Sequence, residues 1–329
     1  MKHCYWLLIL VPLLFGSCDN ELDILEDYQE IPVIYGLINT LDSNHYVRVQ
    51  KGYLGPGNAL EFAQNADSLY YDTASVRITL EKIVNGNPQP VGTFRPDFTI
   101  VKEEGVFTNN DHYVFKLANT GLDYTKQYRL KFVNLNTGKV VTATTPLIPD
   151  IYQRNLTPNT KVNLADPAPF IVRFSSSEYG KIYGLILRIR YVEESLDSLQ
   201  IRTTKTLDYK LPPIYTLTTL GGEEMAFQIN GSSIFSFMGN SIPENPNVMR
   251  LAGDVRADFL FTAGTEELYN YLEINSPDNT VNYIPEFTNV IGGKGIFTCR
   301  LDESIKGLVF NPATYDSIAN GRFTGELFE

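Results

Sequence analysis

The stretch LDYTKQYRLKF, residues 122–132, carries the clearest signal of fold in this chain. Its second half alternates, with Tyr128, Leu130 and Phe132 on one side and charged side chains on the other. Alternation with a period of two is typical of a β-strand that buries one face. Leu122 precedes this strand by one short turn, so we expect the hydroxyl of Tyr128 to fasten that turn to the strand.

This pattern resembles the tyrosine corner of fibronectin-type and immunoglobulin-like β-sandwiches. Strand-like runs separated by turn residues surround it, and we count about seven of them. The clearest runs lie at residues 31–38, 45–51, 75–84, 112–117 and 139–147. We therefore predict an N-terminal immunoglobulin/fibronectin-like β-sandwich over residues 31–147, with Leu122 and Tyr128 as its structural tyrosine corner.

A second unit follows. Residues 148–169 are rich in Pro, Asn and Asp, which indicates a linker. We predict that residues 170–329 form a second β-rich domain with a few short helices, joined to the first domain only through this linker. Strand and helix patterns are mixed in this part, with helix candidates at residues 232–238, 265–273 and 311–320.

Two elements of the second unit have well-defined faces. The long strand candidate at residues 180–193 places one set of alternate residues on a single apolar face: Tyr183, Leu185, Leu187, Ile189 and Tyr191. The helix candidate at residues 265–273 has Thr265 as its expected N-cap, and acids follow in its first turn. Its apolar residues Leu268, Tyr271 and Leu272 share one face.

Composition agrees with a mainly β protein. Hydrophobic residues make up 43% and aromatic residues 12% of the chain, which is ample material for a core rich in pleated structure. The net charge is −11, and acidic and basic residues are interspersed without a long basic block. This charge pattern argues against binding to nucleic acid or to anionic lipid headgroups.

The N-terminus predicts export and lipidation. Residues 1–17 have the layout of a signal peptide, with Lys2 near the start and an uncharged apolar run over residues 5–15 that is too short to span a bilayer as a helix. Cys18 follows directly, as in a bacterial lipobox, where the thiol takes a diacylglycerol. Phe15 departs from the aliphatic residue usual in that motif. The alternative is an ordinary secretory signal with an incidental cysteine.

Lipidation of Cys18 implies a membrane-anchored protein. Each buried methylene of an acyl chain adds about 0.8 kcal/mol, so several chains hold a protein firmly. Residues 18–30 are acidic, lack the spacing of a core element and indicate a short solvated tether. We predict a lipid-anchored protein of the cell envelope, at the outer membrane, and the sequence leaves open whether it faces the periplasm or the cell surface.

The remaining reactive residues predict no catalytic or metal centre. Cys4 lies inside the signal peptide, so Cys299 has no partner for a disulfide in the mature chain, and its strand-like surroundings suggest a small buried hydrophobe. His45 and His112 are the histidines of the mature chain, too few with Cys299 for a Cys/His metal cluster. We expect no cofactor.

Other motifs also favour structural interpretations. Residues 292–295 (GGKG) lack the Ser or Thr that follows the lysine of a phosphate-binding loop, so we expect a glycine turn that leads into a strand. The adjacent acids Glu193-Glu194 and Glu223-Glu224 would point to opposite sides of a strand and would not form an acid–base pair. A hydrolase built from dispersed carboxylates stays open as an alternative without positive support.

Four Asp-Ser/Thr-apolar triplets resemble the O-glycosylation acceptor of Bacteroidota envelope proteins. The candidate acceptors are Ser68, Thr73, Ser198 and Ser317. The alternative is that these Asp-Ser and Asp-Thr pairs serve turns and helix caps, for which the same residue types are common.

Three stretches taken together resemble a known family. They are the lipobox at Cys18, residues 31–38 (IPVIYGLI) and residues 287–297 (FTNVIGGKGIF), the last preceded by residues 268–272 (LYNYL). The chain is similar over nearly its whole mature length to a Bacteroidota family of outer-membrane lipoproteins of unknown function, often encoded beside TonB-dependent receptors. The resemblance carries no catalytic residues and implies an envelope lipoprotein accessory to nutrient uptake.

The sequence therefore favours a non-enzymatic envelope lipoprotein that binds a ligand or protein partner, with a TonB-dependent receptor as one candidate. A surface adhesin or structural envelope protein is the main alternative. Sandwich folds serve both roles, so the fold does not choose between them.

Overall fold

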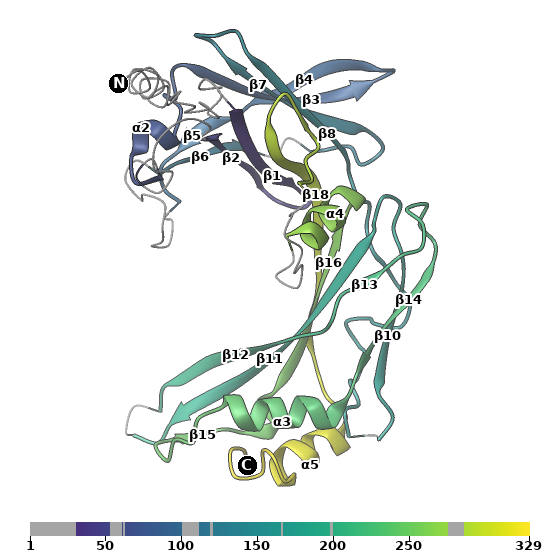
Figure 1. Ribbon diagram of the computed structural model, residues 1–329. Helices are drawn as coiled ribbons and strands as arrows, with labels where there is room; N and C mark the ends of the chain where they lie inside the picture. Colours follow the sequence, from purple (N-terminus) through teal and green to yellow (C-terminus); the bar gives the residue numbers. More distant parts are fainter. Residues whose placement is uncertain are drawn as a thin grey trace, which may run out of the picture.

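The structure is a computed structural model, and it describes residues 31–52, 61, 63–100, 112–118, 121–165, 167–197, 200–275 and 286–329. The chain forms two β-rich halves that meet at an angle, with the N-terminal half at the top of Figure 1 and the C-terminal helices at the bottom. The predicted signal peptide, Cys18 and the acidic tether lie outside the described residues.

The N-terminal half is a sandwich of two sheets. One sheet has the order β1-β2-β6-β5, formed by Ile31–Ile38, Asn44–Gly52, Val114–Ala118 and Arg95–Asp97. The facing sheet has the order β8-β7-β3-β4, formed by Val140–Pro146, Gln127–Asn134, Val76–Val84 and Asn87–Thr93. A four-residue helix, α2 (Ala66–Leu69), precedes β3. The first sheet corresponds to the A-B-E-D sheet of the immunoglobulin fold, and β3, β7 and β8 correspond to its C-F-G sheet, with β4 as a further strand beside β3. The predicted fold class is confirmed.

The predicted corner occupies its expected place at the start of strand β7. Tyr128 is 1% exposed, and its hydroxyl accepts a hydrogen bond of 2.7 Å from the backbone N–H of Asp123. Leu122 packs partly buried against the same core. The bond fastens the turn ahead of β7 to the strand that the turn leads into.

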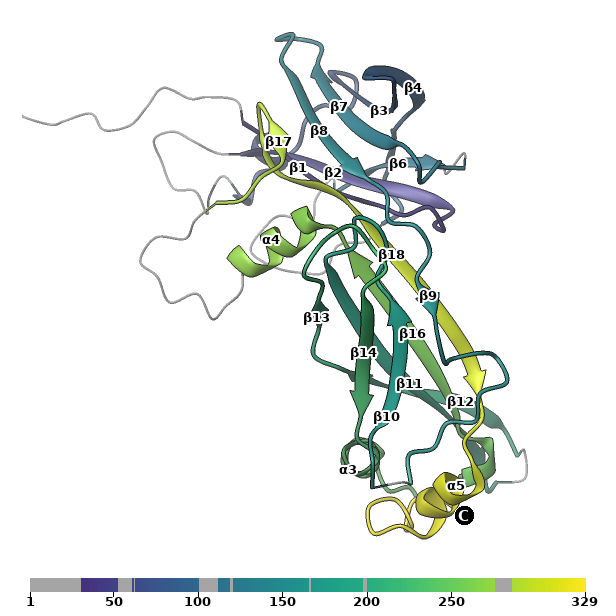
Figure 2. The same ribbon diagram turned by 90° about the vertical axis from the view of Figure 1, so that its right-hand side faces the viewer.

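The C-terminal half has two further sheets. A short sheet has the order β14-β10-β9, formed by Glu224–Ile229, Phe170–Ser175 and Tyr152–Gln153. The larger sheet contains β12, β11 and β16, formed by Arg202–Lys210, Ile182–Ser195 and Arg256–Gly264. The short strands β13 (Ile214–Tyr215) and β15 (Val248–Met249) pair with the two ends of β11. Figure 2 shows the two sheets face to face beneath the first sandwich.

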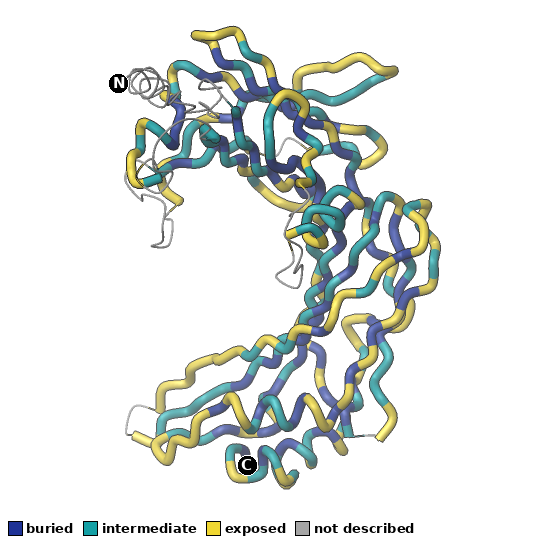
Figure 3. The backbone as a smooth tube through the Cα atoms, viewed as in Figure 1, coloured by how far each residue is buried: buried dark blue, intermediate teal, exposed yellow. Residues whose placement is uncertain are grey.

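The predicted apolar face of the long strand is confirmed, because its alternate residues from Tyr183 to Tyr191 are all buried. Helices α3 (Gly231–Ser241) and α5 (Pro312–Asn320) close the far end, with a 3₁₀ turn, η2 (Ala252–Asp254), beside them. Figure 3 shows buried positions alternating with partly exposed positions along strands of both halves, such as β11 and β7.

A second tyrosine corner occurs in this half, and the sequence analysis missed it. The hydroxyl of Tyr183, at the start of β11, accepts a hydrogen bond of 2.7 Å from the backbone N–H of Ser177. Tyr183 is 1% exposed. The turn between them includes Tyr179 at φ 65° and ends in Gly180, whose Cβ, if present, would lie 2.0 Å from the Tyr183 hydroxyl.

One strand belongs to both halves. Strand β18 (Lys294–Leu308) pairs in parallel with β1 through Cys299, and it pairs antiparallel with β16 from Arg300 onward. The result is one continuous ten-stranded sheet. The expectation that residues 148–169 form the only connection between the halves is therefore wrong, because β18 hydrogen-bonds to the strands of both.

The glycine turn before β18 is confirmed, and it closes the edge of the first sandwich. Strand β17 (Val290–Ile291) pairs with β8 in one sheet, and four residues later Lys294 pairs with β1 in the other. Gly292 adopts φ 83°, and a Cβ on Gly293 would lie 2.5 Å from the carbonyl oxygen of Pro32. The chain can cross between the two sheets here only because these residues lack side chains.

Helix α4 (Glu266–Ile274) lies where predicted, but the predicted cap does not form. Thr265 occupies the N-cap position, yet its side chain makes no cap hydrogen bond. Its hydroxyl instead contacts the hydroxyl of Thr298 on β18, and both side chains are buried. A buried hydroxyl needs a partner, and here the partner is across the domain junction rather than at the helix end.

Substitution at Gly295 tests the shared strand. Gly295 adopts φ 98°, and an added Cβ would lie 2.1 Å from the carbonyl oxygen of Ile34 on β1. Gly295→Ala is expected to lower the free energy of unfolding by at least about 2 kcal/mol, because both the dihedral and the close approach oppose a side chain. Gly253→Ala, where a Cβ meets no atom within 4 Å, is the matched control and should change stability by less than about 0.5 kcal/mol. Urea unfolding followed by circular dichroism measures both; equal effects would contradict the packing.

The two tyrosine corners predict that loss of either tyrosine hydroxyl lowers the stability of the protein. Tyr128→Phe and Tyr183→Phe each remove a hydroxyl that accepts a backbone N–H. Each should cost about 1–2 kcal/mol in the free energy of unfolding, the usual effect of leaving a donor without its partner. Tyr124→Phe, at a side chain 55% exposed, should be neutral in the same urea titration. An unchanged midpoint for both buried variants would show that neither hydroxyl supports its turn.

Candidate ligand-binding site

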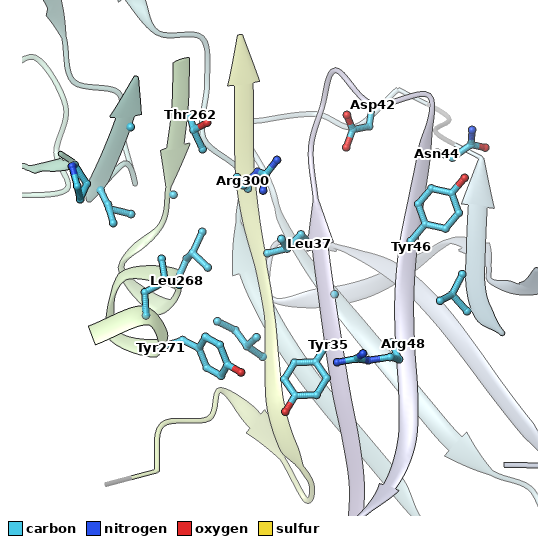
Figure 4. Close-up of a pocket in the computed structure, with 18 residues that line it drawn as sticks. Tyr35, Leu37, Asp42, Asn44, Tyr46, Arg48, Thr262, Leu268, Tyr271 and Arg300 are labelled. Carbon is cyan, nitrogen blue, oxygen red and sulfur yellow. The ribbon is translucent and has the colours of Figure 1, made fainter. Parts of the chain in front are cut away.

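A cavity of about 770 Å³ lies on the concave side of the ten-stranded sheet, where the two halves meet. Strands β2, β1, β18, β16 and β11 form its floor, and helix α4 forms one wall. Figure 4 shows the labelled side chains around the same space, most of them on neighbouring strands, with Leu268 and Tyr271 on helix α4. Apolar and aromatic side chains make up most of the lining.

Alternation on β1 and β2 supplies the N-terminal side of this cavity. Val47 and Ile34 point into the sandwich core and are fully buried. Their neighbours therefore point to the opposite side of the sheet, where Tyr35 pairs directly with Arg48 and Leu37 with Tyr46. The same period-two pattern that builds the core thus places two tyrosines and an arginine on the outer face.

The C-terminal side is built around small residues. Gly264 on β16 pairs with Ile182 on β11, and both line the cavity. A Cβ at Gly264 would lie 2.7 Å from a methyl group of Leu268, so the glycine lets helix α4 approach the sheet. The apolar face predicted for this helix does exist, but it lines the cavity rather than the core, and Leu272 is 47% exposed.

Tyr35 stands between a cation and a second tyrosine (Figure 4). The guanidinium of Arg48 lies 4.9 Å from the centre of the Tyr35 ring, a cation–π contact. The ring of Tyr271 meets Tyr35 edge to face, with ring centres 6.3 Å apart. Burial, and then the neighbouring Tyr35, raise the pKa of Tyr271, so Tyr271 is neutral at pH 7.

The other charged groups of the cavity are engaged. Arg300 forms an ion pair with Asp302 at 2.8 Å. Asp42 accepts a long hydrogen bond of 3.5 Å from the side chain of Asn39. Arg48 has no ion pair within the described residues, and its Nε atom is buried there without a hydrogen-bond partner.

The structure does not gather the predicted modification sites. Cys18 and Ser198 lie outside the described residues. Ser68 lies in α2, Thr73 lies in the turn before β3, and Ser317 lies in α5 at the far end of the chain. None of these three lines the cavity.

Their local contacts are those of turns and helices. The carboxylate of Asp72 accepts the backbone N–H of Ala74 at 3.1 Å, which is the turn role considered for the Asp72-Thr73 pair. The hydroxyl of Ser317 donates to the carbonyl oxygen of Ala313 at 2.9 Å. Whether any of these hydroxyls carries a sugar stays a prediction.

The adjacent acids are held in structural contacts. Glu193 pairs with Arg250 at 2.7 Å, whereas Glu194 pairs with Arg202 at 3.5 Å. Glu223 accepts the backbone N–H groups of Leu217 and Thr218, and these bonds lower the pKa of its carboxyl group. No group of three side chains able to hold a metal ion occurs among the described residues.

Cys299 and the two histidines lie in or beside the core of the first sandwich and its junction with the second half. Cys299 is 1% exposed, as expected for a buried hydrophobe, and its Sγ accepts the backbone N–H of Ile148. Burial raises the pKa of its thiol to about 12. His45 is 1% exposed in the sandwich core, and His112 contacts the hydroxyl of Tyr70 at 3.2 Å.

The cavity residues were not singled out from the sequence, although part of their signal was present. In residues 45–51 the alternation places His45, Val47 and Val49 on one face of the strand and Tyr46 and Arg48 on the other. The second wall comes from α4, more than 200 residues away in sequence, and no local pattern joins the two.

Comparison with known proteins identifies no family. No family model matches the chain, and no curated protein matches it. Among solved structures, one described as "Cytokine receptor complex - Crystal form 1A" aligns at 9% identity, covering 85% of this chain and 99% of that chain, with a TM-score of 0.21. A likeness that weak supports no inference about function. Across the described residues, none of the helices has the length and hydrophobicity that a membrane span requires.

The burial of the Cys299 thiol predicts that it reacts slowly with thiol reagents in the folded protein. In a chain that starts at residue 19, Cys299 is the single thiol. Because its folded pKa of about 12 lies above the ordinary value of 9.0, almost no thiolate forms at pH 8, and labelling by a disulfide reagent should be at least about 100-fold slower than in urea. This raised pKa should leave stability unaffected below about pH 9 and lower it as the pH rises from there toward 12, because the unfolded chain then loses the thiol proton more readily than the folded chain.

The control is the same chain unfolded in urea, where reaction of Cys299 should release one equivalent of the reagent's thiol leaving group per chain. Equal rates in the native and unfolded states would show that Cys299 is accessible, contrary to its burial.

Proposed function

We propose that this protein is a non-enzymatic, lipid-anchored binding protein of the outer membrane that uses the concave junction of its two halves to hold a ligand or partner. The observation that carries the proposal is the cavity itself. It is large, mostly apolar and built on a rigid sheet, which are the usual properties of a binding site.

The contacts of the carboxylates singled out in the sequence favour a binding role over the hydrolase alternative. The carboxylates singled out in the sequence are tied to arginines or to backbone N–H groups rather than paired with each other. None of them lines the cavity. Burial, and then the neighbouring Asp150, raise the pKa of Glu303, but this carboxylate accepts the backbone N–H of Ile151 at 2.8 Å and does not line the cavity.

The cell-envelope part of the proposal rests on the signal peptide and on Cys18. An acyl anchor at Cys18 and a tether of about a dozen residues would keep the first sandwich within about 40 Å of the membrane surface. A position that close to the bilayer suits an accessory to a membrane receptor. We propose a TonB-dependent receptor as the partner, with adhesion to another protein as the alternative.

The test is affinity recovery from native outer membranes through a C-terminal tag, followed by mass spectrometry. We expect a large TonB-dependent β-barrel to be recovered with the wild-type chain. Cys18→Ala should move the protein out of the membrane fraction, because it removes the acyl chains. Leu37→Lys places a charge in the cavity and should reduce recovery of the barrel, whereas Leu135→Lys, at an exposed turn outside the cavity, should not.

Recovery of no barrel by the wild-type chain would contradict the accessory role. Recovery of a host or matrix protein in its place would favour the adhesin. A membrane-bound Cys18→Ala variant would contradict lipidation at that residue.

A further inference from the structure

We infer that the cavity binds an aromatic carboxylate, which the guanidinium of Arg48 holds by its charged end while the tyrosines of the cavity pack against its ring. The inference rests on the binding function proposed above and names the chemical class of ligand. It depends on three observations: a buried donor without a partner, an uncompensated charge, and an aromatic wall.

The first observation is the Nε atom of Arg48. It is buried and has no hydrogen-bond partner among the described residues. A buried donor without a partner is uncommon in folded proteins and costs free energy, because its hydrogen bond to water is lost without replacement. An acceptor oxygen from a bound molecule would satisfy it. Figure 4 shows the Arg48 side chain extending along the sheet toward Tyr35 at the cavity floor.

The second observation is the charge balance of the cavity. Arg300 is already neutralised by Asp302. Arg48 lies over the ring of Tyr35 and forms no ion pair within the described part of the chain. Asp42 also lines the cavity, but it stands away from Arg48 in Figure 4. A cation among apolar side chains favours an anionic ligand. The planar fork of an arginine matches a carboxylate in two parallel hydrogen bonds, and one such cation suits one negative charge.

The third observation is the aromatic wall. Tyr35 and Tyr271 already meet edge to face across the cavity, and Tyr46 stands on the neighbouring strand. Aromatic rings prefer such offset and edge contacts with a further ring. The volume of about 770 Å³ lies in the range of small-molecule sites and is ample for a fused two-ring ligand. Leu37 and Leu268 complete the apolar surface around that ring.

The experiment is isothermal titration of the mature chain carrying Cys18→Ala, so that no acyl chain competes for the cavity. The probes are 2-naphthoate and its neutral analogue 2-naphthamide. We expect 2-naphthoate to bind at least about tenfold more tightly than the amide. Arg48→Gln should reduce 2-naphthoate to the affinity of the amide, and Arg48→Lys, which keeps the charge without the fork, should give an intermediate value.

Two further variants locate the effect. Arg77→Gln removes an exposed arginine on the first sandwich outside the cavity and should change nothing. Gly184→Phe adds a ring into the cavity, where the nearest atom to a Cβ is 3.8 Å away, and should weaken both probes. Thermal unfolding checks that each variant is folded. If Arg48→Gln does not fold, Gly184→Phe still tests whether the probes bind in the cavity.

Several outcomes would overturn the inference. They are equal affinity for acid and amide, undiminished binding to Arg48→Gln, no binding of either probe, or tighter binding of dodecanoate than of 2-naphthoate. A concentration-dependent dimer that Leu37→Asp abolishes would assign the cavity to a second copy of the chain. The receptor proposal can be rejected independently of this inference. If no barrel is recovered from the membranes but 2-naphthoate still binds in a way that depends on Arg48, the proposed partner is wrong and the ligand class is supported.

Discussion

The structure depends on the backbone hydrogen bonds of β18. This strand pairs with β1 at one end and with β16 at the other, so two sandwiches share one sheet. Sandwiches joined by a linker alone can rotate relative to each other, because few contacts cross between them. Here rotation would break the pairing of residues 294–299 with β1. The angle between the halves, and with it the concave face, is therefore set by the sheet.

The shared strand also explains features at the junction that serve no purpose within either half. Gly295 lies so close to the backbone of β1 that a side chain there would push β18 and β1 apart. Cys299 lies where the pairing changes from β1 to β16 and is fully enclosed. The hydroxyls of Thr265 and Thr298 meet across the same place. Each of these residues is explained by the passage of one strand between two domains.

The sequence was sufficient to predict the features that depend on nearby residues, namely the alternation of strand faces and the first tyrosine corner. Tyr128 indicated its own corner because the hydroxyl and the N–H that it accepts lie five residues apart. Alternation along residues 180–193 gave the buried face correctly, since that face depends only on the period of a strand. The corner at Tyr183 was missed, although it has the same form, because its turn carries Gly180 and a left-handed Tyr179 instead of the leucine that marked the first.

The sequence by itself determined that the chain is mainly β, that it begins with a sandwich and which strand faces are apolar, because those properties arise from neighbours one to six residues apart. Only the tertiary structure decided that residues 294–299 complete the first sandwich, and that the apolar face of α4 lines a cavity opposite Arg48. Both facts depend on pairing between residues more than 200 positions apart, and an alternating strand offers the same hydrogen bonds to any edge. Which edge it meets is settled by the packing of the whole chain.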